Sequence, residues 1–476
     1  MDTVGTSLDA SLLEGLRELL GDRLSVNETE RVNHGMDESS FPPAAPDAVA
    51  FLGSTAEASE LVRLCAEHDT PVIPFGAGTS LEGHVLATRG GVAVVMTGMD
   101  RILEVNVEDL DATVQAGVTR KQLNDGLRDH GLFFPVDPGA DASIGGMAST
   151  RASGTTAVRY GTMRDNVLAL TVVLADGRII RTGTRARKSS AGYDLTRLFV
   201  GSEGTLGLIT EVTVRLQGVP PAISSAICRF PTIDQAVDTV ISTIQFGIPI
   251  ARVELLDEPA LEAVNAFSGL DCALEPTLFL EFHGSDAGVV EQAQEVQELA
   301  RNSGGTDFEW ATRTEERNRL WQARHDAYWA ALASRPGCRS ITTDVCVPIS
   351  RLGECIGETK ADIAEGTLNA PLVGHVGDGN FHLTILVEPG NEEELREASE
   401  LNGRLIRRAL SMGGTCTGEH GVGYGKMGYL VEEHGEAIDT MRTIKIALDP
   451  NGIMNPGKVI DVGEAARDPA ATGSSR

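Results

Sequence analysis

Apolar and polar residues alternate along this chain with the periods of both helices and strands. Near the start, five leucines between residues 12 and 20 recur at intervals of three and four, which predicts an amphipathic helix over residues 8–20. Ser7 is the expected N-cap of this helix, and Gly21 follows its last turn. Three prolines between residues 42 and 46 then interrupt the chain, so residues 1–41 are predicted to be an N-terminal helical segment.

Two longer regions follow, each with a mixture of strand and helix patterns. Residues 42–220 are predicted to contain strands at 71–75, 92–96, 113–116, 168–174 and 208–216, with helices at 56–68 and 121–130. Beyond Pro220 and Pro221, residues 221–460 are predicted to contain strands at 224–230, 277–284, 372–376 and 381–387, with helices at 233–246, 289–302, 314–334, 351–365 and 392–412. The mixture indicates an α+β or α/β fold, and the Gly- and Ala-rich residues 461–476 are predicted to be a disordered tail.

The charge balance excludes one class of function. Acidic residues number 68 against 40 basic ones, for a formal net charge of −28, so no nucleic-acid partner is expected, because phosphate contacts need a basic surface.

Seven cysteines occur without a CxxC pair, which argues against a disulfide framework and for a reducing compartment. No basic, apolar leader and no long apolar stretch is visible, so we expect a cytoplasmic protein, with peripheral contact to a membrane left open.

Three glycine-rich segments lie between residues 74 and 207. The first, residues 74–83, follows a short apolar strand, and its glycines would expose backbone N–H groups suited to a pyrophosphate. An ordinary loop with positive φ angles is at least as good an interpretation of this segment alone. The second, residues 135–162, is dense in small and hydroxylated side chains, so a flat ligand could approach the backbone closely. The third, residues 201–207, repeats the pattern, and three such segments are hard to explain as ordinary turns.

Residues 375–382, HVGDGNFH, carry the strongest signal for a metal site. Two strand patterns flank a Gly-Asp-Gly-Asn turn, which is typical of a hairpin. Pairing about the centre of that turn puts His375 opposite His382, so the two imidazoles would share a face, with Cβ atoms roughly 5 Å apart. Thr384 continues that face, whereas Asn380 is a residue type that turns favour anyway. Two imidazoles on one face are a metal-ligand arrangement, and a structural histidine pair is the alternative.

Residues 413–423, GGTCTGEHGVG, place glycines on both sides of Glu419 and His420. Glycine would let both side chains face one site. Glu419 can then complete a His2Glu ligand set with open positions, and His420 can act as a base. A surface Glu-His pair in a Gly-rich loop is the alternative. Arg324, on a predicted helix, can offer a bidentate fork to a substrate carboxylate, although helix periodicity alone favours a surface arginine.

Together, the three glycine-rich segments resemble the FAD-binding module of the vanillyl-alcohol oxidase type flavoprotein family. The resemblance implies that the first segment contacts the pyrophosphate, the second lines the flavin, and the third closes over the cofactor. Members with covalent FAD carry a histidine where this chain has Thr79, so FAD is expected to be non-covalent, and His84 is interpreted as a surface residue or one just behind the site. The implied FAD-binding residues are Pro74, Gly76, Ala77, Gly78, Thr79, Ser80, Pro138, Gly139, Ser143, Gly146, Ser149, Gly154, Tyr160, Gly161, Glu203, Gly204, Ile209 and Asn455.

The stretches HVGDGNFH, TCTGEHG and LWQARHDA, with residues 334–348 and 448–458, resemble the FAD-linked D-lactate dehydrogenase and glycolate oxidase D-subunit branch of that family. The resemblance extends over about residues 30–460. It implies an α+β architecture with a two-part FAD-binding domain of the PCMH type at 42–220. A substrate- and metal-binding C-terminal domain at 221–460 would follow, built as an antiparallel sheet with helices in a ferredoxin-like cap.

The same resemblance implies the roles of the polar residues. His375, His382 and Glu419 would bind zinc or manganese, His420 would be catalytic, and Arg324 would bind the substrate carboxylate. A His2Glu set also suits iron, so the identity of the metal stays open. Where the hydroxyglutarate enzymes carry an asparagine, this chain has Thr384, which favours a monocarboxylate substrate.

The function implied is an FAD- and metal-dependent dehydrogenase that oxidises a D-2-hydroxy acid, D-lactate first, to the 2-oxo acid. The hydride would pass to flavin N5, and the electrons to a non-nicotinamide acceptor such as a quinone, a cytochrome or an electron-transfer flavoprotein. A glycolate oxidase flavin subunit and a D-2-hydroxyglutarate dehydrogenase are the nearest alternatives, and a non-catalytic flavoprotein is a third. A nicotinamide dehydrogenase is not expected, because no G-x-G-x-x-G follows a strand with an acidic residue about 20 positions on. A homodimer is left open.

Overall fold

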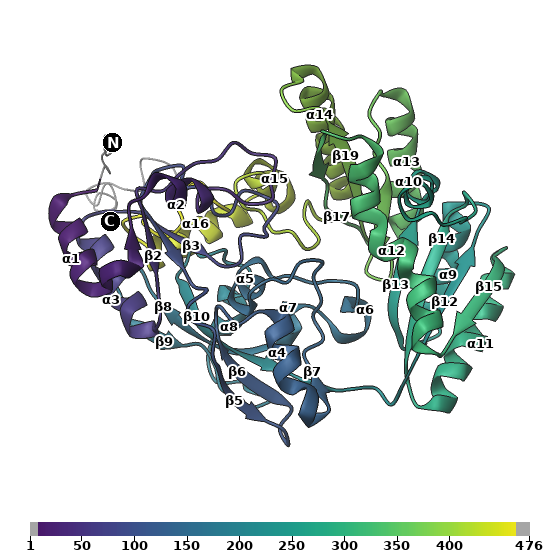
Figure 1. The fold of residues 1–476 in the computed structure, drawn as a ribbon, viewed down its shortest axis with the longest axis horizontal. Coiled ribbons are helices and arrows are strands. Elements are labelled where there is room, and N and C mark those ends of the chain that lie inside the picture. The colour runs from purple at the N-terminus through teal and green to yellow at the C-terminus, as the bar shows by residue number, and fades with distance from the viewer. Residues whose placement is uncertain (1–7, 463–476) are drawn as a thin grey trace. The chain divides into compact units, whose positions relative to one another are not determined.

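The computed structural model describes residues 8–462 and falls into two compact units (Figure 1). Unit 1 takes in the chain up to Ser153, Thr162–Gly218 and the chain from Glu419 onward, and unit 2 takes in Gly154–Gly161 and Val219–Gly418. The units are therefore discontinuous in sequence, whereas the expected domains at 42–220 and 221–460 are continuous. Most of the expected tail at 461–476 lies outside the described residues.

Helix α1 (Ala10–Leu20) begins two residues later than expected and buries one leucine per turn, at Leu12, Leu16 and Leu20. The expected cap, Ser7, lies outside the described residues. The N-cap is Asp9, whose carboxylate accepts hydrogen bonds from the backbone N–H groups of the first turn at 2.8 and 3.4 Å. The helix ends at Leu20, and Gly21 follows it as the C-cap, as predicted, with φ at +56°.

Unit 1 contains two principal sheets. In the four-stranded sheet the order is β1-β2-β4-β3, with β4 parallel to both β2 and β3. In the five-stranded sheet the order is β5-β6-β10-β8-β9, and every pair is antiparallel. A short third sheet pairs β7 with β11. The bounds are β1 Leu24–Ser25, β2 Ala48–Phe51, β3 Val72–Phe75, β4 Val92–Val95, β5 Ile102–Asn106, β6 Asp111–Gln115, β7 Leu132–Phe133, β8 Val167–Val173, β9 Ile179–Arg181, β10 Leu208–Arg215 and β11 Gln217–Gly218.

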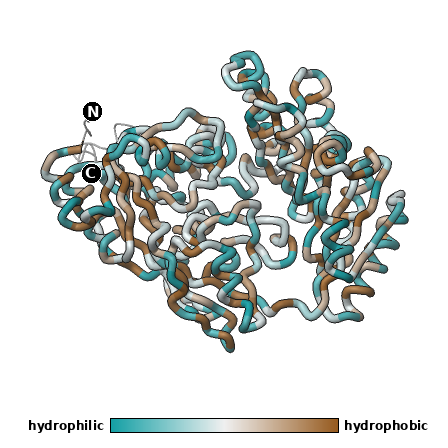
Figure 2. Tube along the Cα trace, viewed as in Figure 1, coloured by the Kyte–Doolittle hydropathy of each residue, from teal (hydrophilic) through white to brown (hydrophobic). Residues whose placement is uncertain are grey.

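The central strands of unit 1 are buried, whereas the edge strands β5 and β9 are partly exposed. All four residues of β4 are buried, as expected of a parallel strand with both faces covered. Hydrophobic residues are frequent in the sheets, while hydrophobic and hydrophilic residues alternate along the helices (Figure 2). The helices of this unit are α1, α2 Glu28–Asn33, α3 Thr55–Glu67, α4 Arg120–Leu127, α5 Ile144–Thr150, α7 Met163–Asn166, α8 Leu195–Phe199, α15 Met427–His434 and α16 Ala437–Leu448.

Unit 2 is built on one antiparallel sheet of eight strands, in the order β15-β12-β14-β13-β18-β19-β16, with β17 paired to β19. The bounds are β12 Ala222–Arg229, β13 Ile250–Leu256, β14 Thr277–Gly284, β15 Thr306–Ala311, β16 Arg339–Thr342, β17 Val345–Cys346, β18 Leu372–His375 and β19 Asn380–Val387. Its helices are α6 Ala157–Tyr160, α9 Ile233–Gln245, α10 Glu258–Ser268, α11 Asp286–Asn302, α12 Thr314–Ser334, α13 Leu352–Glu365 and α14 Glu392–Ser411. Three short 3-10 turns, Gly21–Arg23, Arg128–His130 and Ile349–Arg351, complete the described elements of the chain.

Helices α10 and α12 pack on one another and on one face of this sheet. Their hydrophobic cluster joins small residues of α12, such as Ala323 and Ala327, to Phe279 of β14. The Trp321 ring lies 6.2 Å from the Phe279 ring, centroid to centroid. The face that carries Phe279 is therefore the face that α12 covers, which matters for the polar residues of β13 described below.

The α+β expectation is confirmed, and the predicted strands and helices lie within three residues of observed ones. The helix at 314–334 has the predicted bounds. Several elements were not predicted, among them strands β2, β5, β13, β15 and β16 and helices α10, α15 and α16. Among the helices of residues 8–462, none combines the length and the apolar character needed to span a bilayer. None of the seven cysteines, all of which are described, forms a disulfide.

A buried carboxyl in unit 2 gives a prediction for the pH dependence of stability. Asp257 caps α10 and accepts hydrogen bonds from the N–H groups of Ala260 and Leu372, both at 3.1 Å. Burial raises the pKa of Asp257 from 3.8 to about 6, although Lys360 opposes the change. Between those values the folded protein holds a proton that the unfolded chain has lost. Stability should therefore fall by about 3 kcal/mol as the pH rises through this window.

Asp257→Asn keeps an oxygen acceptor without the charge, so its melting temperature relative to the parent should rise between pH 5 and pH 7.5. The matched control is Asp286→Asn, at an exposed position in the first turn of α11. Thermal melts at both pH values check this, and a difference that does not change with pH would contradict it.

Candidate functional site

The three glycine-rich segments meet within unit 1. The first follows β3, and a Cβ atom at Gly76 would lie 2.6 Å from the Ser143 hydroxyl oxygen, in the second segment. In the third, a Cβ at Gly204 would lie 2.4 Å from Cγ of Pro74. The backbone N–H of Glu203 also donates to the carbonyl of Ser149 at 2.9 Å. The segments approach so closely that only glycine fits at Gly76 and Gly204.

Most of the predicted FAD-binding residues belong to unit 1. Pro74 lies in β3, Gly76, Ala77, Gly78, Thr79 and Ser80 in the loop after it, and Pro138 and Gly139 in the loop before α5. Ser143 caps α5, which contains Gly146 and Ser149, while Glu203 and Gly204 precede β10, which contains Ile209. Asn455 follows α16. Gly154, Tyr160 and Gly161 belong to unit 2, where the Tyr160 hydroxyl lies 2.7 Å from Nδ1 of His283.

The first loop fits the pyrophosphate of a dinucleotide. Gly78 has φ at +72°, and the loop makes a sharp turn without regular structure. No acceptor among the described residues takes a hydrogen bond from the backbone N–H groups of Gly78, Thr79 or Ser80. Such N–H groups at the end of a strand can bind an anion. The side chains of the loop are small, so the cofactor can reach the backbone.

Glu203 and His84 form a buried pair in this unit. Nε2 of His84 lies 3.2 Å from a carboxylate oxygen of Glu203, and the same carboxylate accepts the N–H groups of Val422 and Gly423, both at 2.7 Å. Burial lowers the pKa of His84, but Glu203 outweighs it and the pKa is raised; Glu203 shows the mirror case, with its pKa lowered. His84 is 6 % exposed, which excludes the surface alternative, and its contact with Glu203 agrees with the other alternative, a residue just behind the predicted FAD-binding residues. The Glu203 carboxylate of this pair therefore holds the backbone at Val422 and Gly423, which follow Glu419 and His420 closely in sequence.

The close contact of Gly204 with Pro74 gives a prediction for the stability of unit 1 and for FAD binding. Gly204→Ala should destabilise unit 1 by about 1–3 kcal/mol, because the new Cβ collides with Pro74 and the residue keeps a φ of +72°. Gly131→Ala is the matched control, since Gly131 also has positive φ but no atom within 4 Å of the point where a Cβ would lie. Thermal melts and FAD titration should show a larger loss for Gly204→Ala, and equal losses would contradict the role of the contact with Pro74.

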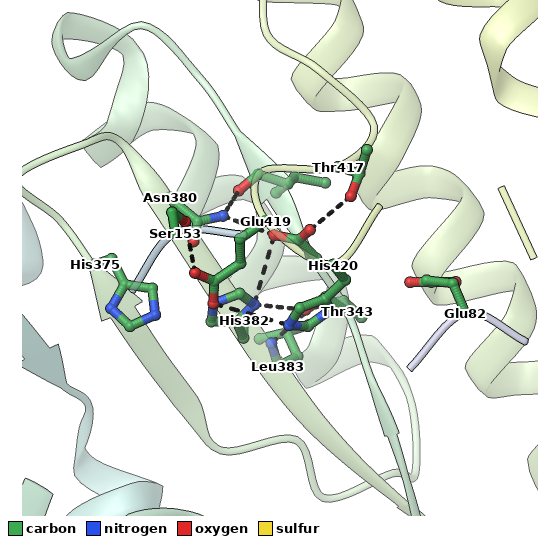
Figure 3. A network of polar contacts seen from close by, with 12 residues as sticks. Glu82, Ser153, Thr343, His375, Asn380, His382, Leu383, Thr417, Glu419 and His420 are labelled. Carbon is green, nitrogen blue, oxygen red and sulfur yellow. Dashed lines mark hydrogen bonds and ion pairs between the residues drawn. The ribbon is translucent and has the colours of Figure 1, made fainter. Parts of the chain in front are cut away.

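In unit 2, the two predicted metal-binding histidines lie together on the β18–β19 hairpin (Figure 3). The predicted register was wrong: His375 pairs with Asn380, and His382 pairs with Val373. The loop between the paired His375 and Asn380 is four residues long, 376–379, and begins one residue before the expected Gly-Asp-Gly-Asn turn. Gly379 lies against the carbonyl of Val347. The shift is two residues, so both imidazoles still share a face, now as diagonal neighbours. Their ring centroids are 5.2 Å apart.

Hydrogen bonds fix the tautomer of both rings. Nδ1 of His382 lies 2.9 Å from the carbonyl oxygen of Thr343 and must donate to it. Nδ1 of His375 lies 2.8 Å from the carboxylate of Glu254. In the neutral imidazole, an Nδ1 proton used in this way leaves the lone pair on Nε2, as a metal ligand requires. The donor set of unit 2 therefore fits a divalent transition metal.

A buried polar cluster beside His382 was not predicted. Asp344 is fully buried, and its carboxylate accepts hydrogen bonds from Nδ2 of Asn380 at 2.8 Å and from the Thr417 hydroxyl at 2.8 Å. A Cβ at Gly418 would lie 2.3 Å from Nδ2 of Asn380. Asn380 is thus more than a turn former, and the cluster fixes the residues that directly precede Glu419.

Glu419 and His420 belong to unit 1. The Ser153 hydroxyl donates to the Glu419 carboxylate at 2.7 Å, and Nε2 of His420 lies 3.9 Å from the other carboxylate oxygen of Glu419. Both side chains are largely buried, at 15 % and 11 % exposed. Burial contradicts the alternative of a surface Glu-His pair. Ser153 lies in a run of small residues, and its role as a partner of Glu419 could not be read from the sequence.

Arg324, on α12, is not a surface arginine. Its side chain is 18 % exposed, and its Nε and Nη2 both lie 2.7 Å from one oxygen of Glu254. The edge of the Arg324 guanidinium formed by Nε and Nη2 is therefore already paired with Glu254. The Nη1 end is the part that can take a substrate carboxylate.

Two family models match the chain. The model described as "FAD binding domain" matches residues 46–183, and the model described as "FAD linked oxidases, C-terminal domain" matches residues 219–459. A solved structure of p-cresol methylhydroxylase with substrate bound aligns with a TM-score of 0.79, covering 97 % of this chain and 99 % of that one, at 19 % identity. At that identity the likeness shows the fold, and it confirms the expected two-part FAD-binding architecture.

Two curated proteins show closer similarity in sequence. A "Probable D-lactate dehydrogenase, mitochondrial" of Danio rerio is 53 % identical over 456 residues, which cover 95 % of this chain and 92 % of that protein. A "D-lactate dehydrogenase [cytochrome], mitochondrial" of Arabidopsis thaliana is 49 % identical over 452 residues, which cover 94 % of this chain and 80 % of that protein. Both names place the relatives in mitochondria, so they give no support to the cytoplasmic location expected from the sequence.

Proposed function

Because the chain belongs to the FAD-linked oxidases of the vanillyl-alcohol oxidase type, we propose that it is an FAD- and metal-dependent dehydrogenase of D-2-hydroxy acids, with D-lactate as the preferred substrate. The names of the relatives support the substrate. The observation that carries the metal dependence is the pair of imidazoles of His375 and His382 on one face of a buried hairpin, with ring centroids 5.2 Å apart and both Nδ1 atoms against protein oxygens.

The third ligand in this proposal is Glu419. It is covalently bonded to Gly418, which packs against Asn380 in the same unit as the two histidines, and consecutive Cα atoms are about 3.8 Å apart. His2Glu leaves open positions for a substrate, as catalytic sites do. A divalent cation bound there would polarise the substrate oxygens and make the 2-hydroxyl easier to deprotonate.

In this proposal two side chains of the protein bind the substrate and remove its proton. Arg324 binds the substrate carboxylate through its Nη1 end, and His420 takes the proton of the 2-hydroxyl as the base. FAD, when bound, supplies the two-electron acceptor for the hydride that leaves C2. One proton and one hydride leave the substrate, which gives the 2-oxo acid. Electrons then pass to a non-nicotinamide acceptor, and a cytochrome is the acceptor that the name of one relative supports.

The residue at position 384, a threonine, supports a substrate with a single carboxylate. It is 4 % exposed on β19, and its N–H donates to the carbonyl of Pro371 at 3.0 Å. Its position on the face of His382 is where the hydroxyglutarate enzymes carry an asparagine, and a threonine lacks the amide that would reach a second carboxylate.

Steady-state turnover with an artificial electron acceptor tests the proposal. The purified, metal-replete protein is assayed with D-lactate, L-lactate, glycolate and D-2-hydroxyglutarate. We expect the highest kcat/KM for D-lactate and none above background for L-lactate. A higher kcat/KM for glycolate or D-2-hydroxyglutarate would replace D-lactate with that substrate, and no turnover with any of them would reject a 2-hydroxy acid.

A further inference from the structure

One buried carboxylate in unit 2 contacts both a proposed metal ligand and the proposed carboxylate-binding arginine. Glu254 lies on β13, is completely buried, and stands opposite Phe279 on the face that α12 covers. Its two oxygens lie 2.8 and 3.0 Å from Nδ1 of His375. One of them also lies 2.7 Å from Nε and from Nη2 of Arg324. Three elements, β13, β18 and α12, therefore meet at a single side chain.

A carboxylate in this position does not favour folding. Removing an ion from water costs several kcal/mol, and an apolar side chain of similar volume is often neutral or stabilising instead. The polar partners that compensate the burial of Glu254 are His375 and Arg324, which both lie within hydrogen-bonding distance of its carboxylate. The rest of the strand is apolar where it is buried: Ile250, Ala251, Val253, Leu255 and Leu256. Packing alone does not require a glutamate.

The two histidines of the pair are backed differently. Nδ1 of His382 donates to a backbone carbonyl, whereas Nδ1 of His375 lies against the carboxylate of Glu254, which also pairs with Arg324. A carboxylate behind a ligating imidazole fixes the ring and makes Nε2 a stronger donor. The same carboxylate occupies one edge of Arg324, so it also determines which end of the guanidinium is presented to a ligand.

We infer that Glu254 is a positioning residue that sets both the donor strength of His375 and the orientation of Arg324, so that the metal and the substrate carboxylate are bound through one shared group. The inference rests on the proposed function for what His375 and Arg324 bind. Loss of the Glu254 charge should therefore weaken two binding events at once: that of the metal and that of the substrate carboxylate.

The first test measures metal affinity without turnover. Apoprotein prepared with a chelator is titrated with Mn²⁺ in competition with a fluorescent chelator. Glu254→Gln should raise the Kd for Mn²⁺ about 10- to 100-fold. Glu281→Gln is the matched control, because Glu281 also pairs with a histidine and an arginine, His283 at 2.9 Å and Arg252 at 3.4 Å, on the neighbouring strand. Its Kd should stay within about 3-fold of the parent, since His283 is not a proposed ligand.

The second readout is the split between KM and kcat. Glu254→Gln assayed at saturating Mn²⁺ should show a raised KM for D-lactate with a smaller change in kcat, because Arg324 loses its alignment. If Glu254→Gln does not fold, Arg324→Lys answers the same question. Lysine cannot bridge the carboxylate with a planar fork, so Glu254 is held less firmly and the Kd for Mn²⁺ should rise several-fold.

The outcomes separate the inference from the proposed function. A folded Glu254→Gln protein with an unchanged Kd for Mn²⁺ overturns the inference, as does an equal loss of affinity in Glu281→Gln. A parent protein that binds no divalent metal overturns the metal site itself, and with it the proposed function.

Discussion

His420→Ala is expected to lower kcat with D-lactate by on the order of 10²- to 10⁴-fold, the range that general bases contribute, while FAD stays bound. The proposed base is largely buried, and the backbone after it is fastened by the buried Glu203 carboxylate. The substitution removes the group that takes the hydroxyl proton and leaves the glycine-rich segments unchanged. Stopped-flow measurement of flavin reduction by D-lactate, on protein with full FAD content, checks the effect.

His130→Ala is the control for this variant, because His130 is exposed on a short 3-10 turn of unit 1. It should reduce its flavin at the parent rate. Normal flavin reduction in His420→Ala would remove His420 from the catalytic role and direct the search for a base to other groups.

His382→Ala should lose the bound metal and, with it, turnover, by on the order of 100-fold or more. The imidazole supplies one of the two Nε2 atoms of the proposed His375–His382 ligand pair, and His382 is 7 % exposed. Changes to the groups that hydrogen-bond a metal ligand already cost about 10- to 100-fold in affinity or activity, and loss of a ligand should cost at least as much. Metal content by mass spectrometry and kcat/KM before and after chelator treatment give the measurement.

The parent protein treated with chelator should lose activity and regain it when Zn²⁺ or Mn²⁺ is returned, whereas His382→Ala should regain little. His434→Ala, on α15, is the matched histidine control and should keep its metal. Parent-like metal content and activity in His382→Ala would contradict the assignment of this ligand.

Much of the site could be predicted because its residues are close in sequence. Two histidines on one face of a hairpin follow from the two-residue period of strands. The register could not be predicted, because glycine and aspartate in this stretch suit a turn at more than one position. The observed loop, residues 376–379, begins one residue before the expected Gly-Asp-Gly-Asn turn. The error was an even number of residues, so the face was right and the pairing was wrong.

The residues that were missed act through partners distant in sequence. Glu254 lies in a mostly apolar segment, Ile250–Leu256, that was not recognised as a strand. The signal that the sequence offered for a functional residue was a glutamate among these apolar residues. Helix periodicity, which favours a surface position for Arg324, cannot show that a polar face of α12 is covered by a carboxylate from β13. His84 finds its partner Glu203 only through the fold. Pairing between buried charges decides these positions, and a single sequence does not show it.

Anaerobic addition of D-lactate to the purified, metal-replete protein, with the flavin absorbance recorded, tests the proposed activity in one step. We expect the oxidised flavin band to bleach with D-lactate and to stay unchanged with L-lactate. A yellow protein that remains oxidised with D-lactate would contradict the proposed activity, and a colourless protein that cannot take up FAD would contradict the cofactor surface described for unit 1.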